Sequence, residues 1–493
     1  MNLFTNRIFL AVALFVGTMV VGSLSITKNR QLEMMDDMAE DYFYLAGNLY
    51  HFGEFYPADT VPFVKRPPGY TYFIYTVLKI WGGMPVVGTV FKNAQEVERI
   101  NKRSYKAVYW AQLLLLAISA AVLFLWLANH IRLRYALIAA ILYGSNPYMI
   151  ILCGLLHYEM VHAFCLVMGC FLLDWAIREK EISWWKLGIA GVFWGLATLL
   201  RPISLLLPGF ILLLFVAKYY WKWKLILKLT GIFTLAMLLT ISPYTYRNYS
   251  ITGRFIPVNA QGSMAIWGST VLEFERTPNH YKWWEVWYSE GLPLFEKITN
   301  QTEFTYHSRV ANIFLMEEKF KEAAIENLKE KPGVYISNVF TNFLTLQLDI
   351  NSVYIKIYQF IQKPGNKFQK HWFAIGDEQE FHDSKSADSF DLFISLMALL
   401  SLGGIVLGIK KRDAFLLVPG AVYLCVCFAH TITYMDMMYY YMKVPFLFVF
   451  SAFFLHKLDT MKVQVPNLKW NVSTIIVGIV LIYGLKLTVE IIL

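Results

Sequence analysis

Long apolar runs, most of them near the length needed to cross a bilayer, recur from one end of the chain to the other. Of its 493 residues, 57% are hydrophobic and only 16% are charged, which is far from the mixture of a soluble globular protein. We therefore predict an all-α polytopic membrane protein with about eleven transmembrane helices. The expected spans are residues 8–26, 107–128, 135–152, 160–177, 186–201, 202–217, 225–245, 389–409, 414–430, 444–456 and 472–492.

Basic loops between the runs predict the orientation of the chain. If the N-terminus is cytoplasmic, every loop expected on the inner face is rich in lysine and arginine, as the positive-inside rule requires. This parity requires that residues 69–81, which are apolar but too short for a comfortable crossing, form an interfacial helix. We expect a multi-pass protein of the cell membrane. The inner loops are residues 129–134, 178–185, 218–224, 410–413 and 457–471.

The chain divides into three parts. Residues 1–245 form a transmembrane module that includes a first outer loop at 27–106, residues 246–387 form a mainly helical extracytoplasmic segment, and residues 388–493 form the C-terminal transmembrane helices. The net charge of +9 does not indicate nucleic acid, because the basic residues stand in short clusters between apolar runs. The five cysteines lie within or at the ends of apolar runs without metal-ligand spacing, so we expect no disulfide framework.

The stretch from residue 36 to residue 70 combines acids, a helical pattern and a basic corner at the expected membrane surface. Asp36, Asp37, Glu40 and Asp41 stand at the start of a run with apolar residues at 3–4 spacing. Arg66 then precedes two prolines, which set a rigid corner before the next apolar run. The pattern alone favours a solvated loop and a functional site about equally.

Five motifs resemble those of the bacterial protein-mannosyltransferase-like glycosyltransferases of the GT-C superfamily (glycosyltransferase family 39 type), relatives of the lipid A aminoarabinose transferases. The motifs follow the family's order on the expected membrane faces. The resemblance extends to about residue 350, and beyond it residues 441–445 only echo the family's Arg-Tyr-Arg-x-Pro. The motifs are Tyr-x-x-Leu-Ala-x-Asn-Leu at 42–49, Lys/Arg-Pro-Pro-x-Tyr at 66–70, Asn-Pro at 146–147 with Tyr-Glu at 158–159, Gly-Leu-Ala-x-Leu-x-Arg-Pro at 195–202 and Pro-x-x-x-Arg-Asn-x-x-x-x-Gly-x-Phe-x-Pro at 243–257.

The resemblance implies transfer of a hexosyl or pentosyl group, with inversion, from a polyprenyl-phosphate donor to a lipid, glycan or protein acceptor on the extracytoplasmic face. In such a reaction a carboxylate deprotonates the acceptor hydroxyl. Arginines stabilise the lipid phosphate as its negative charge grows. The resemblance implies Tyr42 and Tyr70 in the substrate groove. The implied catalytic acids are Asp37, favoured as the base, Asp41, Glu40 and Glu159, and the implied phosphate-binding residues are Arg66, Arg201 and Arg247.

Two positions depart from the family pattern. The family's catalytic Asp stands four residues before the helix tyrosine, where this chain has Met38, so Asp37 is one residue out of register. The aminoarabinose transferases place an acidic metal ligand two residues before the proline pair, where this chain has Lys65. We therefore expect no required cofactor, and a divalent metal is left open but unsupported.

Alternatives remain for single residues and for the whole chain. Glu159 opens an apolar span, where a charge is usually functional, but an acid also suits a helix N-terminus. Arg201 either reaches the lipid phosphate or pairs with the acids, and Arg66 and Arg247 also suit anchoring to lipid headgroups. The alternative function is a polytopic transporter or flippase of a lipid-linked or anionic substrate, since transporters also bury charges within spans.

Overall fold

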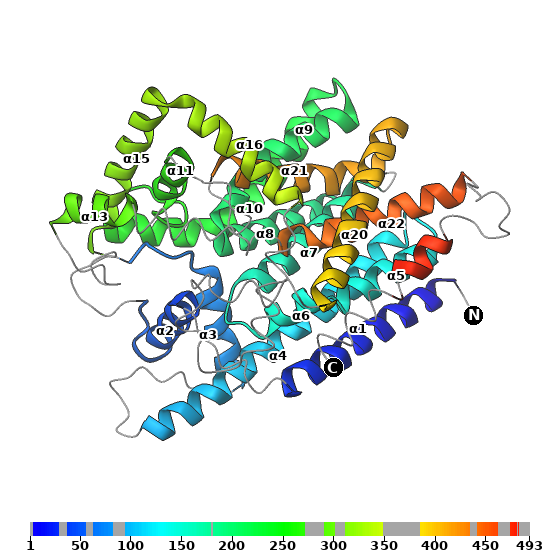
Figure 1. The fold of residues 1–493 in the computed structure, drawn as a ribbon, viewed down its shortest axis with the longest axis horizontal. Helices are drawn as coiled ribbons and strands as arrows, with labels where there is room; N and C mark the ends of the chain where they lie inside the picture. The colour runs from blue at the N-terminus through cyan, green and yellow to red at the C-terminus, as the bar shows by residue number, and fades with distance from the viewer. Residues whose placement is uncertain are drawn as a thin grey trace.

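Helices make up the regular structure of the computed structural model, which describes residues 3–28, 37–55, 63–81, 94–178, 181–271, 290–300, 311–348, 385–433, 441–461, 474–480 and 482 (Figure 1). The all-α polytopic fold predicted from the sequence is therefore confirmed. The helices, with two 3-10 turns (η), are α1 (Leu3–Lys28), α2 (Asp37–Phe52), α3 (Gly69–Trp81), α4 (Ala94–Leu127), α5 (Leu133–Gly144), α6 (Pro147–Cys153), α7 (Glu159–Arg178), α8 (Trp184–Leu200), η1 (Pro202–Leu206), α9 (Leu207–Tyr219), α10 (Trp223–Thr252), α11 (Gly262–Thr270), α13 (Leu292–Thr299), α15 (Ile313–Glu330), α16 (Pro332–Leu348), α20 (Lys385–Lys411), η4 (Ala414–Leu416), α21 (Leu417–Ile432) and α22 (Val444–Thr460).

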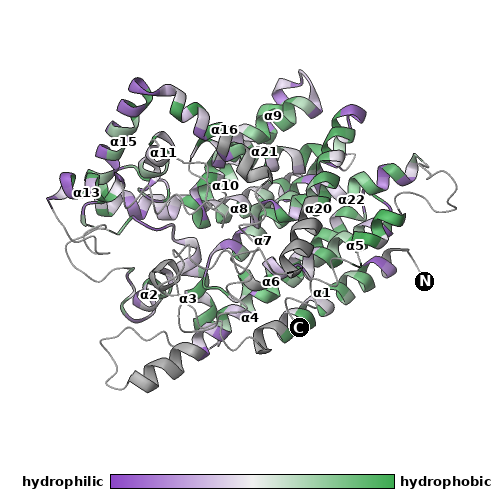
Figure 2. Cartoon of the chain, viewed as in Figure 1, coloured by the Kyte–Doolittle hydropathy of each residue, from purple (hydrophilic) through white to green (hydrophobic). Residues whose placement is uncertain are grey.

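Within the described residues, six helical segments are long and apolar enough to cross a membrane. Figure 2 shows the hydrophobic residues of these segments along the body of the bundle. α5 and α8 are apolar too, but they are shorter. The count of about eleven crossings stays a prediction. The six segments are Asn6–Leu24, Arg103–Leu127, Glu159–Arg178, Pro202–Tyr219, Trp223–Thr252 and Ala414–Ile432.

The apolar run at 135–152 is broken into two helices, α5 and α6. The break falls at Asn146-Pro147, because proline lacks a backbone N–H and disfavours a helical conformation in the residue before it. The Oδ1 atom of Asn146 accepts a hydrogen bond from the backbone N–H of Met149 (3.2 Å), which caps α6. Proline at the first position of α6 suits a helix start.

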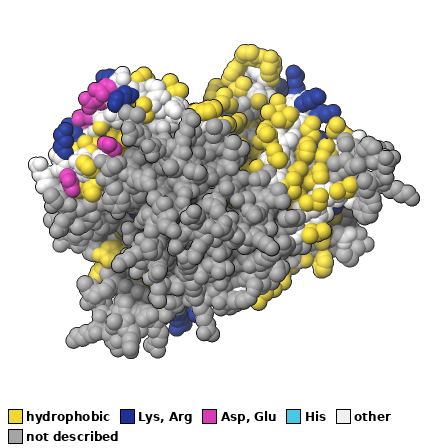
Figure 3. Space-filling model, in the orientation of Figure 1, with side chains coloured by type: hydrophobic (Ala, Val, Ile, Leu, Met, Phe, Trp, Pro, Cys, Tyr) yellow, Lys and Arg dark blue, Asp and Glu magenta, His cyan; other side chains and the backbone are white. Residues whose placement is uncertain are grey.

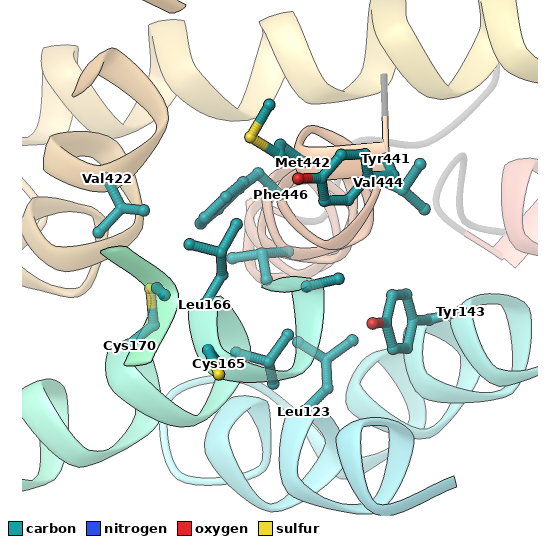
Figure 4. Close-up of a cluster of buried hydrophobic side chains, with 14 of the residues drawn as sticks. Leu123, Tyr143, Cys165, Leu166, Cys170, Val422, Tyr441, Met442, Val444 and Phe446 are labelled. Atoms are coloured by element: carbon teal, nitrogen blue, oxygen red, sulfur yellow. The ribbon is translucent and has the colours of Figure 1, made fainter. Parts of the chain in front are cut away.

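Helices far apart in the sequence share one core. α22 packs against α5 and α20, and α21 packs against α9, so the C-terminal helices close over the N-terminal ones. In Figure 4, Tyr441 just before α22 and Phe446 in its first turn share a buried cluster with Leu166 of α7 and Val422 of α21. Residues 441–446 therefore lie against the helix that begins with Glu159.

α10 continues past residue 245, where the expected span ends. The segment after α10 packs against the last turns of this helix. The side-chain amide of the buried Asn248 donates hydrogen bonds to the carbonyls of Ile256 (3.1 Å) and Val258 (3.0 Å). Gly253, with a φ of +66°, ends the helix in the left-handed conformation that glycine adopts readily. The chain then returns along α10 toward the first loop.

A smaller apolar cluster joins α11, α13 and α15 outside the main core. The rings of Trp267 and Phe320 meet edge to face at 4.8 Å, and Phe295 is buried in the same cluster. Glu317 of α15 accepts a hydrogen bond from the backbone N–H of Ser263 in the first turn of α11 (3.2 Å). Figure 3 shows acidic and basic side chains at the upper left, where α13 and α15 lie in Figure 1, and hydrophobic side chains at the upper right.

Candidate active site

Three tyrosine rings from three elements meet at the end of the bundle where α2 and α3 lie. Tyr42 of α2 contacts Tyr70 of α3, with ring centroids 5.4 Å apart, and Tyr158, just before α7, with centroids 5.9 Å apart. We call these three residues the tyrosine cluster. Buried phenol groups need hydrogen-bond partners, and the Tyr70 hydroxyl donates to Oε1 of Gln112 on α4 (3.2 Å). Gln112 also donates to two backbone carbonyls at and just after the end of α6.

Two arginines flank the tyrosine cluster. The guanidinium carbon of Arg66 lies 5.8 Å from the ring centroid of Tyr42, and that of Arg201 lies 5.5 Å from the ring centroid of Tyr158. Both arginines are half-buried. Each contact has the geometry of a cation–π interaction. Two cations held at one partly covered place in a membrane protein suit an anionic ligand.

Backbone hydrogen bonds fix the position of Arg66. The carbonyls of residues 63, 64 and 65 accept, in this order, from Nη1 of Arg247 (2.8 Å), the backbone N–H of Ala260 (2.9 Å) and the side-chain amide of Asn259 (3.1 Å). Arg247 of α10 and the segment that returns along α10 therefore hold residues 63–65 in place. The guanidinium of Arg66 follows directly on this anchored strip of backbone.

A close approach between α3 and α8 sets the place of Arg66 relative to Arg201. α3 begins at Gly69, and a Cβ atom on Gly69 would lie 2.8 Å from the carbonyl carbon and oxygen of Leu199 and 2.9 Å from the backbone nitrogen of Leu200. Only glycine fits here, because the neighbours are backbone atoms that cannot rotate away. The contact puts the segment that follows Arg66 against the residues that precede Arg201.

We expect Gly69→Ala to lower the melting temperature of the purified protein, because overpacking at a close contact costs about 1–3 kcal/mol. Gly188→Ala in α8 is a matched control: nothing lies within 4 Å of a Cβ atom there. Its melting temperature should rise or stay unchanged, since alanine is favoured over glycine within a helix by about 1 kcal/mol. Thermal unfolding in detergent measures both. Equal melting temperatures for Gly69→Ala and the wild type would show that α3 is not held against α8.

Glu159, the first residue of α7, is 0% exposed beside the tyrosine cluster. Neither carboxylate oxygen has a hydrogen-bond partner among the described residues, although Nδ1 of His157 lies 3.4 Å from Oε2. The helix N-terminus favours a negative charge, but burying a carboxylate without hydrogen bonds is costly. A buried acceptor of this kind is typical of a position that receives its hydrogen bonds from a ligand.

A second layer of polar side chains supports Arg201. Tyr441, just before α22, forms a hydrogen bond with Arg201, and its hydroxyl also lies 3.0 Å from Nδ1 of His162. The other ring nitrogen of His162 is 3.2 Å from the hydroxyl of Ser204 in η1. Both nitrogens of this buried histidine are therefore engaged. The chain of contacts joins the start of α22, α7 and η1 around Arg201.

Burial and two nearby charges set the pKa values of the tyrosines. Burial raises the pKa of Tyr70, Tyr158 and Tyr441 above the usual value. The cation of Arg201 acts against this rise at Tyr158 and Tyr441, whereas the carboxylate of Glu159 raises the pKa of all three. The phenols are therefore neutral hydrogen-bond donors. Arg201 contacts the ring of Tyr158, the residue before Glu159, so the two charged residues lie near each other.

Most of the predicted site residues come together here. The structure joins Tyr42, Tyr70, Arg66, Arg201 and Glu159 in one place. The predicted catalytic acids of the first loop lie in the first two turns of α2, and their side chains fall outside the described residues. These acids are Asp37, Glu40 and Asp41.

Arg247 is placed differently from the other two predicted phosphate ligands. It donates to the carbonyl of Phe63, and its guanidinium carbon lies 5.1 Å and 5.3 Å from the ring centroids of Phe55 and Tyr244. Its described contacts therefore anchor the first loop on α10. A phosphate-binding role for Arg247 stays a prediction.

Sequence reasoning missed four residues that build the site: Gln112, His162, Ser204 and Tyr441. The signal available in the sequence was a polar side chain within or beside an apolar run. Burying such a side chain in a membrane costs free energy, so it usually has a hydrogen-bond partner or a function. Tyr441 also lies in the weak echo of the family motif at 441–445.

Among the described residues, no group of three or more His, Cys, Asp and Glu side chains could hold a metal ion. Lys65, which stands where the aminoarabinose transferases have an acidic ligand, is buried. Its ammonium would repel a cation at that position. Independence from a metal stays a prediction.

Comparisons with known proteins bear on this arrangement. The family model described as dolichyl-phosphate-mannose-protein mannosyltransferase matches residues 95–246. A search of curated proteins finds no match. The archaeal oligosaccharyltransferase AglB from Archaeoglobus fulgidus, in complex with an inhibitory peptide and a dolichol-phosphate, is similar with a TM-score of 0.55 at 12% identity, over 99% of this chain and 56% of AglB.

Two further solved structures are similar at the same low identity. The Archaeoglobus fulgidus oligosaccharyltransferase in complex with Zn and sulfate has a TM-score of 0.55 at 11% identity, over 96% of this chain and 52% of that one. ArnT from Cupriavidus metallidurans in the apo state has a TM-score of 0.40 at 12% identity, over 100% of this chain and 90% of ArnT.

The chain spans about half the length of the oligosaccharyltransferase structures that it matches. At these identities the likeness shows the fold, and the family model adds a match in sequence over α4 to α10. Both findings agree with the motifs at 146–147, 158–159 and 195–202, which lie inside the matched segment. Residues 95–246 therefore match the dolichyl-phosphate-mannose-protein mannosyltransferase family model, and the chain shares the fold of the archaeal oligosaccharyltransferase.

Proposed function

We propose that the protein is a membrane glycosyltransferase that moves a sugar from a polyprenyl-phosphate donor to an acceptor, with inversion, on the extracytoplasmic face. The observation that carries the proposal is the pair Arg66 and Arg201 beside one buried tyrosine cluster and the buried carboxylate of Glu159. The fold supports it, because the AglB structure with this fold was solved with a dolichol-phosphate.

The residue types suit the chemistry of each bond. As the bond between sugar and phosphate breaks, negative charge grows on the phosphate, and two guanidinium groups stabilise it best when they are already in place. Neutral tyrosine hydroxyls add hydrogen bonds without adding charge. A carboxylate must take the proton of the acceptor hydroxyl, and α2 begins with Asp37 one turn and a half before Tyr42.

The second carboxylate, Glu159, has a different role in this proposal. Its oxygens are fully buried, so it accepts hydrogen bonds from the donor sugar or from the acceptor once they are bound. Hydrogen bonds that form only with the substrate in place can orient the reacting atoms. Asp41 and Glu40 remain alternative bases, because they follow Asp37 within the same two turns of α2.

The partners follow from this role. The donor is a lipid-linked hexose or pentose, and the acceptor is a lipid, a glycan or a protein; another structure of the oligosaccharyltransferase is tethered to an acceptor peptide. No metal or other cofactor is required. A transporter or flippase of a lipid-linked anion would also bind phosphate at the two arginines. It would not need the carboxylates for turnover, and mutation of the acids therefore separates the two functions.

We expect Arg66→Ala to weaken binding of undecaprenyl phosphate by roughly tenfold to a hundredfold, the range for loss of a charge-assisted hydrogen bond. Arg66→Lys should retain part of the affinity, because lysine keeps the charge but loses the planar fork. Binding to the purified protein in detergent is measured directly, without an acceptor.

Arg254→Ala is the matched control for this experiment. Arg254 is exposed near the end of α10 and lies 4.5 Å from the ring centroid of Phe314, so its loss should leave the affinity unchanged. Equal affinities for the wild type and Arg66→Ala would remove Arg66 from the phosphate site.

A further inference from the structure

Lysines and aromatic rings gather at the end of the bundle opposite the tyrosine cluster. α7 and α9 end there, and α8 and α10 begin there. The described aromatic residues of this surface are exposed, with Tyr220 at 73% and Trp221 at 67%. Figure 3 shows Lys and Arg side chains beside hydrophobic ones at the upper right, the side on which α9 lies in Figure 1. We call the surface formed by Trp184, Trp185, Tyr220, Trp221, Lys224 and Lys228 the lysine–tryptophan surface.

Ring contacts hold the lysine–tryptophan surface together across two helices. The ammonium of Lys228 on α10 lies 4.3 Å from the ring centroid of Trp184 on α8. Lys224 stands one turn before Lys228 and therefore shares its helix face. Trp221 and Trp223 stand in the turn before them, with ring centroids 5.6 Å apart. Tyr220 and Trp221 both have positive φ angles, +32° and +55°, in this turn, and both side chains are exposed.

The two lysines of this surface have no acidic partner in the part of the chain that the structure describes. Two other basic residues at this end do have acidic partners: Arg134 pairs with Asp459 (2.6 Å) and Lys457 pairs with Asp413 (2.7 Å). Among the described residues, no carboxylate lies within ion-pair distance of Lys224 or Lys228. Glu181 is exposed before α8 and forms no ion pair with either lysine. The uncompensated positive charge suits an anion from outside the chain.

The position of the surface identifies the anion. The segments Glu159–Arg178 and Pro202–Tyr219 end here and Trp223–Thr252 begins here, so the rings lie at the level of the headgroups. Tryptophan enters this layer with its ring in the acyl region and its N–H in the polar region. α8 and α10 also begin without an acid in their first turn or a side-chain cap, which leaves their N-terminal N–H groups to an anion.

We propose that the lysine–tryptophan surface binds the headgroup phosphate of an anionic phospholipid. The lysines would contact the phosphate of the lipid headgroup, and the tryptophans would flank the acyl chains at the membrane interface. The site lies at the other end of the bundle from Arg66 and Arg201, and it does not depend on the proposed transferase activity.

The test uses the full-length protein in bilayer nanodiscs of phosphatidylcholine and phosphatidylglycerol at four to one. Native mass spectrometry measures the ratio of the two lipids that stay bound to the protein. The wild type should retain phosphatidylglycerol in preference to phosphatidylcholine. Lys224→Gln/Lys228→Gln should reduce this preference by about fivefold for each lysine removed, from about 1 kcal/mol per lysine at an anionic surface.

Lys410→Gln/Lys411→Gln is the matched control, because it removes two exposed lysines at the same end, where no described ring contact joins them to a tryptophan. It should keep the preference of the wild type. Equal losses in the two double variants would overturn the proposal, since they would show an effect of total charge alone. Displacement of phosphatidylglycerol by inorganic phosphate would also overturn it, because the site would then take a soluble anion.

Discussion

Asp37→Asn is expected to lower turnover by roughly a hundredfold or more in a transfer assay with a labelled lipid-linked sugar, the scale of a lost general base. Asp37 is the first residue of α2, the helix that carries Tyr42 into the tyrosine cluster. Asparagine has nearly the same shape and also suits a helix start, so the fold should survive the change. Binding of undecaprenyl phosphate should be unchanged, because the arginines remain.

Asp41→Asn is the internal comparison for this experiment. Residues 37 and 41 are four apart in α2, and a helix therefore places them on the same face. Asp41→Asn should lower turnover less than Asp37→Asn does. Its effect would come only from the loss of a negative charge near the positive end of the helix dipole. The opposite ranking would identify Asp41 as the base. If neither variant lost turnover, α2 would not carry the base, and the transporter interpretation would gain support.

The local elements were largely predictable from the sequence. α3 spans Gly69–Trp81, as the short apolar run and the proline pair before it predict. The break of residues 135–152 into α5 and α6 carried a local signal too, because Asn146-Pro147 combines a cap with a proline. The continuation of α10 to Thr252 had no such signal. It depends on the contacts of Asn248 with residues 256–258, which periodicity does not show.

The candidate site was predictable only in part. Tyr42, Arg66 and Tyr70 lie close in sequence, but their meeting with Glu159 and Arg201 depends on long-range packing, above all the contact of Gly69 with Leu199. Only the resemblance to the family motifs predicted that these residues belong to one site; the hydrophobic periodicity of the sequence did not. Tyr441 and His162 are 279 residues apart, so their contact could not be read from local spacing. The acids of the first loop remain predictions, since their side chains lie outside the described residues.

Glu159→Gln is expected to raise the melting temperature while lowering turnover by roughly tenfold or more. This carboxylate is fully buried and has no hydrogen-bond partner among the described residues. Burying a carboxylate without hydrogen bonds is costly, and a neutral amide of the same shape lowers that cost. The same change removes the negatively charged hydrogen-bond acceptor to which the bound substrate would donate. A gain in stability with a loss of activity is typical of a residue kept for function.

Asp174→Asn is the matched control for Glu159→Gln, because it replaces another buried acid on α7. Asp174 lies 2.7 Å from Nε2 of His130 and is therefore paired, near the other end of the helix. Removing one member of a buried pair is destabilising, so this variant should melt at a lower temperature and keep its turnover per folded molecule. Thermal unfolding and the transfer assay on both proteins give the comparison. If Glu159→Gln also melted at a lower temperature and kept its turnover, the contact with His157 would be structural, and Glu159 would leave the proposed site.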